Sequence, residues 1–424
     1  MKRLVAMMTV LLVAAAVSAT AVSAGNGTPN NPGSANALTL AVYGDSPYGT
    51  AVGDQTQVSA TPAFIDTINA DPKVDLVLNV GDIHSGSGHC SASYDRTVAD
   101  LWQAFKNPLV YTPGDNEWTD CQKAKEGGWT STLTTPWPCL TFAAQTKCDG
   151  FYDTAAEGGT HKPGDPLDNL SLVRSLFFPT AGTTLGGQKM QVTSQAQVGE
   201  GTDANYVENV MWEQSKVLFV TVNIPGGSNN DADPWYGVTP ESSRQTQERE
   251  QRTQADLHWL DAAFAKATAD GVNAVVITQQ ADMWDRDGND VIHLAGYEPF
   301  IDNIARNTTA FGKPVLLLDG DSHIYRSDNP LKQGQPCVTE SGAATVACTT
   351  IPDSSTWTQD AWNNHNGITA ERPNGYDVSN FHRVTVHGST LPLEWLSLAV
   401  DPRANNTTSA SAFGPFSWKR MIQS

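Results

Sequence analysis

The sequence has few basic residues for its length. Its 424 residues include 26 Lys and Arg against 45 Asp and Glu, which gives a formal net charge of -19 at pH 7. Nucleic acids and anionic membrane surfaces reward clustered Lys and Arg. The composition therefore argues against nucleic acid and against a membrane surface as the main partner, and it favours a soluble, acidic protein.

Cysteine pairs at a metal-binding or redox spacing are also missing. The cysteines are Cys90, Cys121, Cys139, Cys148, Cys337 and Cys348. None forms a C-x-x-C motif, which argues against a cysteine zinc site and a thioredoxin-like redox pair. An even number of cysteines suits disulfide bonds in an oxidising compartment. The sequence leaves the pairing open. Short separations favour Cys139 with Cys148 and Cys337 with Cys348, which leaves Cys90 to pair with Cys121.

Long apolar runs are absent after the first 24 residues. Residues 1–24 begin with Lys2 and Arg3, continue through an apolar stretch and end on small residues. This pattern predicts a cleaved secretory signal, because the stretch is too short and wrongly flanked for a membrane span. A retained anchor is the alternative, which the small-residue end argues against. With a flexible linker over residues 25–36, we expect a secreted, extracellular protein without a membrane anchor after cleavage, and a short Ala/Val-rich signal is typical of bacteria.

The remaining sequence alternates apolar segments with helical patterns. The apolar segments are LTLAVYGDSPYG, VDLVLNVGDIHSG, PLVYTPGDNEW, VLFVTVNIPGG, AVVITQQAD, VLLLDGDSH, FHRVTVHG and LEWLSLAVDP. Sequence patterns typical of helices occur over residues 61–69, 95–105, 241–269 and 299–310. Strands that alternate with helices predict an α/β layer fold.

One domain accounts for this alternation. We predict that it covers residues 37–402, because no linker separates two self-sufficient cores. Residues 121–210 and 327–380 show little periodicity and predict two long loop insertions. Residues 403–424 are predicted as a C-terminal tail.

Four predicted strands end on a Gly-Asp pair. The pairs are Gly44-Asp45, Gly81-Asp82, Gly114-Asp115 and Gly320-Asp321. Glycine allows a sharp turn, and aspartate projects a carboxylate into the crevice beyond the strand ends. A single pair is more often a turn or a helix cap. Four together predict a metal centre, because converging carboxylates repel one another unless they share a cation.

The order of these motifs resembles that of the calcineurin-like metallophosphoesterases. GDSP, GDIH, GDNE, ITQQ and GDSH each follow a predicted strand, where the family has DxH, GD, GNH(E/D), a histidine after a strand, and GHxH. The resemblance runs from about residue 37 to residue 402. It implies a four-layer α/β/β/α sandwich that holds two metal ions and hydrolyses phosphate esters.

Position by position, the resemblance implies a set of metal ligands. They are Asp45, Asp82 as the bridging carboxylate, Asp115, Gln279, Asp321 and His323. Four histidines of the family pattern are replaced, by Pro47, Asn116, Gln279 and Asp321. A site with so little imidazole suits one or two harder divalent ions, Mn, Mg or Ca rather than Zn.

The resemblance also implies catalytic roles. Asn116 and His84 could bind the phosphoryl oxygens of a phosphate ester while a metal-activated water attacks phosphorus. Asparagine cannot donate a proton, so a poor leaving group would need His84 or water as its acid. His84 could instead replace a lost nitrogen ligand. Arg326 could clamp a phosphate or form a surface salt bridge, and Glu117 would orient its loop.

Two other functions fit the same residues. In a serine esterase of the GDSL kind, Ser46 would attack an ester carbonyl and His323 would be the base, with Asp321 orienting it. Pro47 argues against this, because it removes a backbone N–H that would serve the oxyanion hole. In a non-enzymatic binding module, the lost histidines would mean a lost metal. Nearby aromatic residues, Tyr48 and Trp118 among them, could line a substrate cleft or pack the loops.

Overall fold

The computed structural model describes residues 36–49, 51, 53–127, 164–230, 233–237, 240–285, 295–332, 336–338, 346–347 and 376–422. These residues belong to one compact unit. The predicted signal, nearly all of the predicted linker and three of the cysteines (Cys139, Cys148 and Cys348) lie outside the described residues. Within the described part of the chain, no helix is both long enough and apolar enough to cross a membrane.

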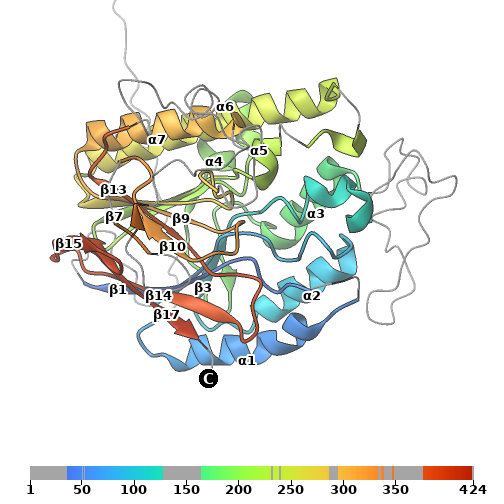
Figure 1. The fold of residues 1–424 in the computed structure, drawn as a ribbon, viewed down its shortest axis with the longest axis horizontal. Coiled ribbons are helices and arrows are strands. Elements are labelled where there is room, and N and C mark those ends of the chain that lie inside the picture. Colours follow the sequence, from blue (N-terminus) through green and yellow to red (C-terminus); the bar gives the residue numbers. More distant parts are fainter. Residues whose placement is uncertain are drawn as a thin grey trace, which may run out of the picture. The chain divides into compact units, whose positions relative to one another are not determined.

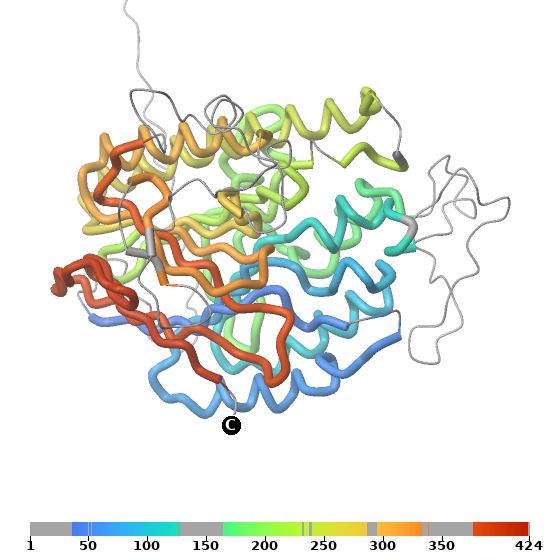
Figure 2. The backbone as a smooth tube through the Cα atoms, viewed as in Figure 1, coloured from blue at the N-terminus to red at the C-terminus, as the bar shows by residue number. Residues whose placement is uncertain are grey.

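The first sheet has eight strands in the order β15-β16-β17-β14-β1-β2-β3-β4. Their bounds are β1 (Leu38–Tyr43), β2 (Leu76–Asn79), β3 (Pro108–Tyr111), β4 (Leu185–Gly186), β14 (Glu394–Val400), β15 (Asn406–Ser409), β16 (Ala412–Gly414) and β17 (Phe416–Ile422). Strands β1, β2 and β3 are parallel, and β14 pairs antiparallel to β1. The backbone trace in Figure 2 shows how this brings the start and the end of the domain, blue and red, into one sheet.

The second sheet has seven strands in the order β10-β13-β9-β8-β7-β6-β5. Their bounds are β5 (Thr193–Ser194), β6 (Val210–Gln214), β7 (Val217–Thr221), β8 (Ala274–Thr278), β9 (Val315–Asp319), β10 (Arg326–Asp328) and β13 (Phe381–Thr385). Strands β7, β8, β9 and β13 are parallel. A short separate pair joins β11 (Pro336–Cys337) to β12 (Val346–Ala347).

Helices cover the outer faces of both sheets (Figure 1). The α-helices are α1 (Thr56–Ala70), α2 (Ala92–Trp102), α3 (Pro166–Phe177), α4 (Gln195–Val198), α5 (Gly226–Asn230), α6 (Ser243–Ala269) and α7 (Glu298–Phe311). Short 3-10 turns lie at η1 (Asp120–Gln122), η2 (Ala124–Glu126), η3 (Gly201–Asn205), η4 (Trp235–Gly237) and η6 (Ala295–Tyr297). Helices α1, α2 and α3 pack on the first sheet, and α6 and α7 on the second.

Alternating side chains build the layers. In β1, Leu40 and Val42 join the core between the two sheets, while Ala41 and Tyr43 face the helices. Strand β8 follows the same rule, because Val276 faces the first sheet and its neighbours face α6 and α7. Successive strand residues point to opposite faces. The predicted four-layer α/β/β/α sandwich is therefore confirmed.

The predicted helices are confirmed with small shifts at their ends, but one prediction about loops is wrong. The segment 121–210 was expected to be a long loop, yet it contains α3, α4 and two short strands. Helix α3 starts at an Asp165 cap with Pro166 in its first turn, and it buries Leu170, Val173 and Phe177. This apolar stripe is only two turns long, so the surrounding Gly- and Thr-rich sequence hid it.

The prediction of a C-terminal tail is also wrong. Strands β15, β16 and β17 lie within residues 403–424 and extend the first sheet. Strand β17 pairs with β14 over its whole length, from Val400 with Phe416 to Glu394 with Ile422. Phe416 and Trp418 are buried in the core between the sheets. These two apolar residues alternate with the exposed Ser417 and Lys419, and this alternation marks a strand with one solvated face.

Candidate metal centre

The four Gly-Asp pairs meet where strands of the two sheets end. Backbone hydrogen bonds connect the loops, because Asp45 N donates to Gly81 O at 2.9 Å and Gly320 N donates to Gln280 O at 2.9 Å. Asp321 N in turn donates to Asp45 Oδ1 at 2.9 Å. Carboxylates from β1, β2, β3 and β9 are thereby brought together, as the sequence predicted.

The loops that carry these side chains have an unusual backbone. Asp45, Asp82, Asp321 and His323 all adopt left-handed conformations, with φ values of 49°, 56°, 69° and 61°. Such conformations cost a non-glycine residue about 1–3 kcal/mol each and persist where the surrounding structure enforces them. Four strained residues within one constellation therefore indicate a functional site.

Two glycines allow the carboxylates to pack closely. A Cβ atom on Gly114 would lie 1.9 Å from Asp82 Oδ1, and one on Gly388 would lie 2.2 Å from the Cβ of Asp45. Neither position could hold a side chain without displacing a carboxylate. The third Gly-Asp pair therefore needs glycine at position 114, because only a residue without a side chain lets the loop lie this close to the Asp82 carboxylate.

The candidate ligands form two groups that share one residue. Asp45, Asp82 and His323 make the first group, and Asp82, Asp115 and Asp321 make the second. Within each group the ligand atoms lie within 4.8 Å of one another. Two cations held about one shared carboxylate would fit this arrangement.

Burial makes these carboxylates hard to ionise. Burial, reinforced by the neighbouring acids, raises the pKa values of Asp45, Asp82 and Asp321 well above the usual range. Burial together with Asp120 raises the pKa of Asp115 to about 7. Among the described residues, no Lys or Arg forms an ion pair with any of the four. Lys123 lowers the pKa of Asp115 without contacting it, because its ammonium pairs with Asp120 and Asp233. The described residues therefore form a negative cluster with no Lys or Arg side chain in direct contact.

The donor set fits divalent cations. Asp45 Oδ2 is fully buried and accepts no hydrogen bond, so it is an open ligand atom. Burial and the nearby His387 lower the pKa of His323 to about 4, which keeps its imidazole neutral. Its Nε2 lies 3.6 Å from Asp45 Oδ1. A site of four carboxylates and one imidazole is of the kind that harder divalent ions prefer.

One oxygen of the shared Asp82 is surrounded by donors. Asp82 Oδ2 accepts hydrogen bonds from Tyr48 Oη at 2.7 Å, Asn116 Nδ2 at 3.0 Å and Gln280 Nε2 at 3.1 Å. Asn116 Nδ2 also donates to Tyr48 Oη at 2.8 Å. Tyr48 additionally packs edge-on against His323, with ring centroids 5.0 Å apart. Sequence reasoning treated Tyr48 only as one of several aromatics and missed this bond.

The structure also corrects the predicted glutamine. Gln279 points away from the carboxylates, since its Nε2 donates to Ala281 O at 2.8 Å. Gln280 takes the predicted place and donates to Asp82 and to Asp115 Oδ1 at 3.0 Å. Side-chain alternation explains the shift by one residue, because Val276 of β8 faces the first sheet and residues 278 and 280 continue that face.

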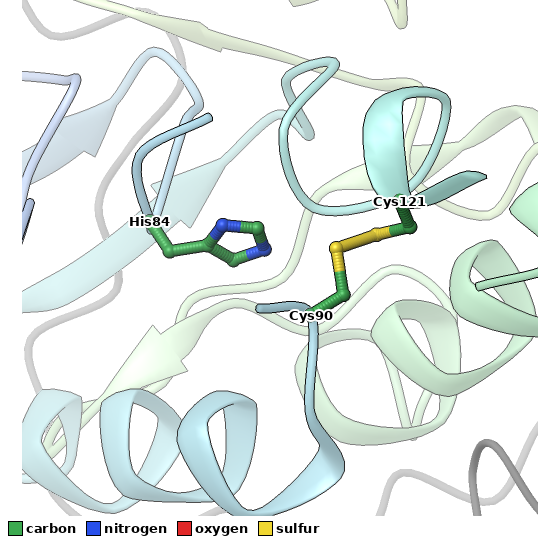
Figure 3. A group of neighbouring side chains, drawn as sticks. All are labelled: His84, Cys90 and Cys121. Atoms are coloured by element: carbon green, nitrogen blue, oxygen red, sulfur yellow. A yellow bond between two sulfur atoms is a disulfide. The ribbon is translucent and has the colours of Figure 1, made fainter. Parts of the chain in front are cut away.

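His84 lies in a different environment. It is buried, it stands edge-on to Tyr94, and its Nδ1 lies 3.3 Å from Ser85 O. Burial lowers its pKa to about 4. Figure 3 shows it beside the disulfide of Cys90 and Cys121. That disulfide confirms the predicted pairing, and bonded sulfurs are not thiolate ligands. Among the described residues, His84 joins none of the acidic ligand groups.

Three further predicted residues have clear environments. Glu117 Oε1 accepts from Gly114 N at 2.7 Å and from Tyr111 Oη, so it orients its loop as predicted. Arg326 is buried against Asp282 and Asp285 rather than free on the surface. No hydrogen bond joins Ser46 to His323 in the described part of the chain, so the pairing that a serine nucleophile needs is not present.

The fold and the site together define a two-sheet α/β protein with an acidic candidate metal site at its strand ends. Comparison with known proteins agrees with this class: the model of the calcineurin-like phosphoesterase family matches residues 38–325. This chain belongs to that family, as its motif order predicted.

Other comparisons are more distant. No curated protein sequence matches the chain. Among solved structures, a purple acid phosphatase isolated from yellow lupin (Lupinus luteus) seeds matches with a TM-score of 0.39 and 10% identity. The match covers 92% of this chain and 52% of that one, so the chain spans about half the length of the plant protein.

Proposed function

We propose that this protein is a metal-dependent phosphoesterase that hydrolyses phosphate mono- or diesters. The observation that carries the proposal is the pair of ligand groups that share Asp82, amid buried carboxylates that no described Lys or Arg contacts directly. Bound divalent ions would lower the pKa of a water molecule and neutralise charge on the phosphoryl group. Membership of the phosphoesterase family supports the same reaction class.

Each protein group has a role in this proposal. Asp45, Asp82, Asp115, Asp321 and His323 hold the ions. Mn, Mg or Ca suits these ligands better than Zn, because oxygen donors outnumber the single imidazole.

Asn116 is proposed to bind a phosphoryl oxygen, because its amide lies at the shared carboxylate. Tyr48 orients that amide and Asp82. His84 stays a predicted phosphate-binding or acid residue, although its position beside the disulfide gives that role no support.

An assay with three substrate classes tests the function. The full chain is given an aryl phosphate monoester, a diester and an aryl acetate, with and without chelator, after its metal content is measured. Phosphate release that chelator abolishes and that Mn²⁺ restores is the expected result. Chelator-resistant acetate cleavage that is lost in Ser46→Ala would establish the esterase instead. No turnover with any metal would favour a binding module.

We also propose that the protein is exported. The signal-like residues 1–24 and the Cys90–Cys121 disulfide support this, since disulfides persist mainly in oxidising compartments. Sequencing the N-terminus of protein recovered from the culture medium tests it, and a new N-terminus near residue 25 is expected. Retention of the full chain inside the cell would contradict export.

A further inference from the structure

Gln280 lies between the two sheets and touches both carboxylates on one side of the metal centre. It is fully buried, and its Oε1 accepts from Gly226 N at 2.7 Å. A backbone N–H can only donate, so the amide atom that faces Gly226 must be the oxygen. The amide nitrogen therefore faces Asp82 and Asp115, to which it donates at 3.1 and 3.0 Å.

This orientation places a hydrogen-bond donor where a cation would need a ligand atom. Two of the three residues in the second group, Asp82 and Asp115, accept from the Gln280 amide. Gly226 allows Asp115 to pack on the same side, because a Cβ there would lie only 2.4 Å from Asp115 Oδ2. An ion that takes Asp82 Oδ2 and Asp115 Oδ1 as ligands must displace the amide from both, and each such bond contributes about tenfold or more to an equilibrium.

In the first group, the Gln280 amide contacts only the shared residue, Asp82. Asp45 Oδ2 is buried and accepts no hydrogen bond. Asp82 Oδ1 has only a long contact, 3.4 Å, from Asn116 N. The His323 imidazole is turned toward Asp45, with its Nε2 3.6 Å from Asp45 Oδ1. A cation that binds Asp45 Oδ2 and Asp82 Oδ1 does not have to displace the Gln280 amide, which donates to other oxygens.

We propose that the two cation positions are unequal: Asp45, Asp82 and His323 bind the tighter ion, and Gln280 weakens the position at Asp82, Asp115 and Asp321. This inference rests on the proposed metal dependence and deepens it. Over a range of ion concentration the protein then carries one ion, and it fills the second position only at higher concentration. Gln280 is a positioning residue whose amide sets this difference.

Calorimetric titration of Mn²⁺ into the metal-free full chain tests the proposal. The wild type is expected to show two binding events whose dissociation constants differ by at least about tenfold. Gln280→Met keeps the length of the side chain and removes its donor, so the weaker event should tighten about tenfold while the tighter event is unchanged. Gln280→His supplies an imidazole and should tighten the weaker event further. Gln279→His is the matched control and should leave both events unchanged.

Several results would overturn the inference. Two equal events in the wild type would contradict it, as would a weaker event that Gln280→Met leaves unchanged in a chain whose circular dichroism matches the wild type. If Gln280→His fails to fold, Gln280→Met still decides the matter. Metal-dependent phosphate release with two equal events would overturn the inference alone. Absence of any ion binding would overturn both the inference and the proposed function.

Discussion

Two buried charged clusters lie next to each other in this protein, and they differ in one respect. Arg383 of β13 pairs with Asp282 and makes two bonds of 2.9 Å to Asp328, and Arg326 approaches Asp282 at 3.4 Å. We call this the paired cluster. Among the described residues, no arginine forms such a pair with the four aspartates of the metal centre. The fold thus pairs its structural charges internally and leaves the charges of the site for a partner from solution.

The two clusters are connected through one loop. Ser322, between Asp321 and His323, donates to Asp282 Oδ2 at 3.0 Å. The paired cluster therefore holds the loop whose flanking residues enter the metal centre. A rigid, neutralised support beneath an uncompensated site is what a preorganised cation site needs.

The largest expected effect comes from breaking the paired cluster. Arg383→Met should destabilise the fold by about 3–5 kcal/mol, because it leaves Asp282 and Asp328 buried without a counterion. Thermal unfolding should show a Tm lower by roughly 10 °C. Arg403→Met, which breaks only the exposed pair with Asp401, is the control and should change Tm little. Equal shifts in both variants would contradict the role given to the paired cluster.

Removing the shared carboxylate should mainly affect ion binding. Asp82→Asn removes a ligand from both groups and should weaken Mn²⁺ binding more than about 100-fold. Substituting a residue that only hydrogen-bonds to a metal ligand usually weakens binding by about 10- to 100-fold. The ion-free chain should not lose stability, because a neutral amide replaces an acid whose ionised form is disfavoured by burial. Calorimetry and thermal unfolding measure the two effects. Asp100→Asn, at an exposed position of α2, is the control, and the account fails if both variants bind Mn²⁺ alike.

The metal centre should also respond to pH. Its buried carboxylates have raised pKa values, and that of Asp115 is about 7. The folded, ion-free chain therefore holds protons that the unfolded chain releases near pH 4, so it loses stability as pH rises from about 4 to 7. A bound cation displaces these protons, and its apparent affinity should rise by up to about tenfold per pH unit below 7. The gain in Tm on adding Mn²⁺ should grow from pH 5 to pH 7 and then level off, and a gain independent of pH would contradict this.

The smallest effect is expected at Tyr48. Tyr48→Phe removes one donor from Asp82 Oδ2 and one partner of Asn116, which should cost the ion-free chain about 1.5 kcal/mol. In the presence of Mn²⁺ the loss should be smaller, because the cation takes over the charge of Asp82. Urea unfolding with and without Mn²⁺ measures the difference. An equal loss in both conditions would mean that Tyr48 only packs the loop.

The sequence predicted the layers and the four carboxylates because both depend on local patterns. Apolar runs that end on Gly-Asp fix where each strand stops, and the parallel strands then bring Asp45, Asp82 and Asp115 to one edge. The strands within residues 403–424 were not predicted. Strand β15 is short, and β17 mixes apolar with charged residues and is stabilised by its pairing with β14. Pairing of this kind is decided by distant residues rather than by local sequence.

Two site residues also needed the structure. Gln279 and Gln280 are adjacent and identical, so only the face that β8 turns toward the first sheet decides which one meets Asp82. Tyr48 follows a proline, and nothing in its spacing connects it to Asp82, 34 residues further along the chain. Side-chain direction at a strand end and contacts across loops are tertiary properties, and motif order does not contain them.

The most direct test of the account is to locate the ions. Crystals of the full chain soaked in Mn²⁺ and measured at the manganese absorption edge should show an anomalous peak among Asp45, Asp82 and His323. A second, weaker peak should lie among Asp82, Asp115 and Asp321, and it should strengthen as Mn²⁺ is raised. No peak at either position, with the four carboxylates still clustered, would contradict the claim that this site exists to hold cations.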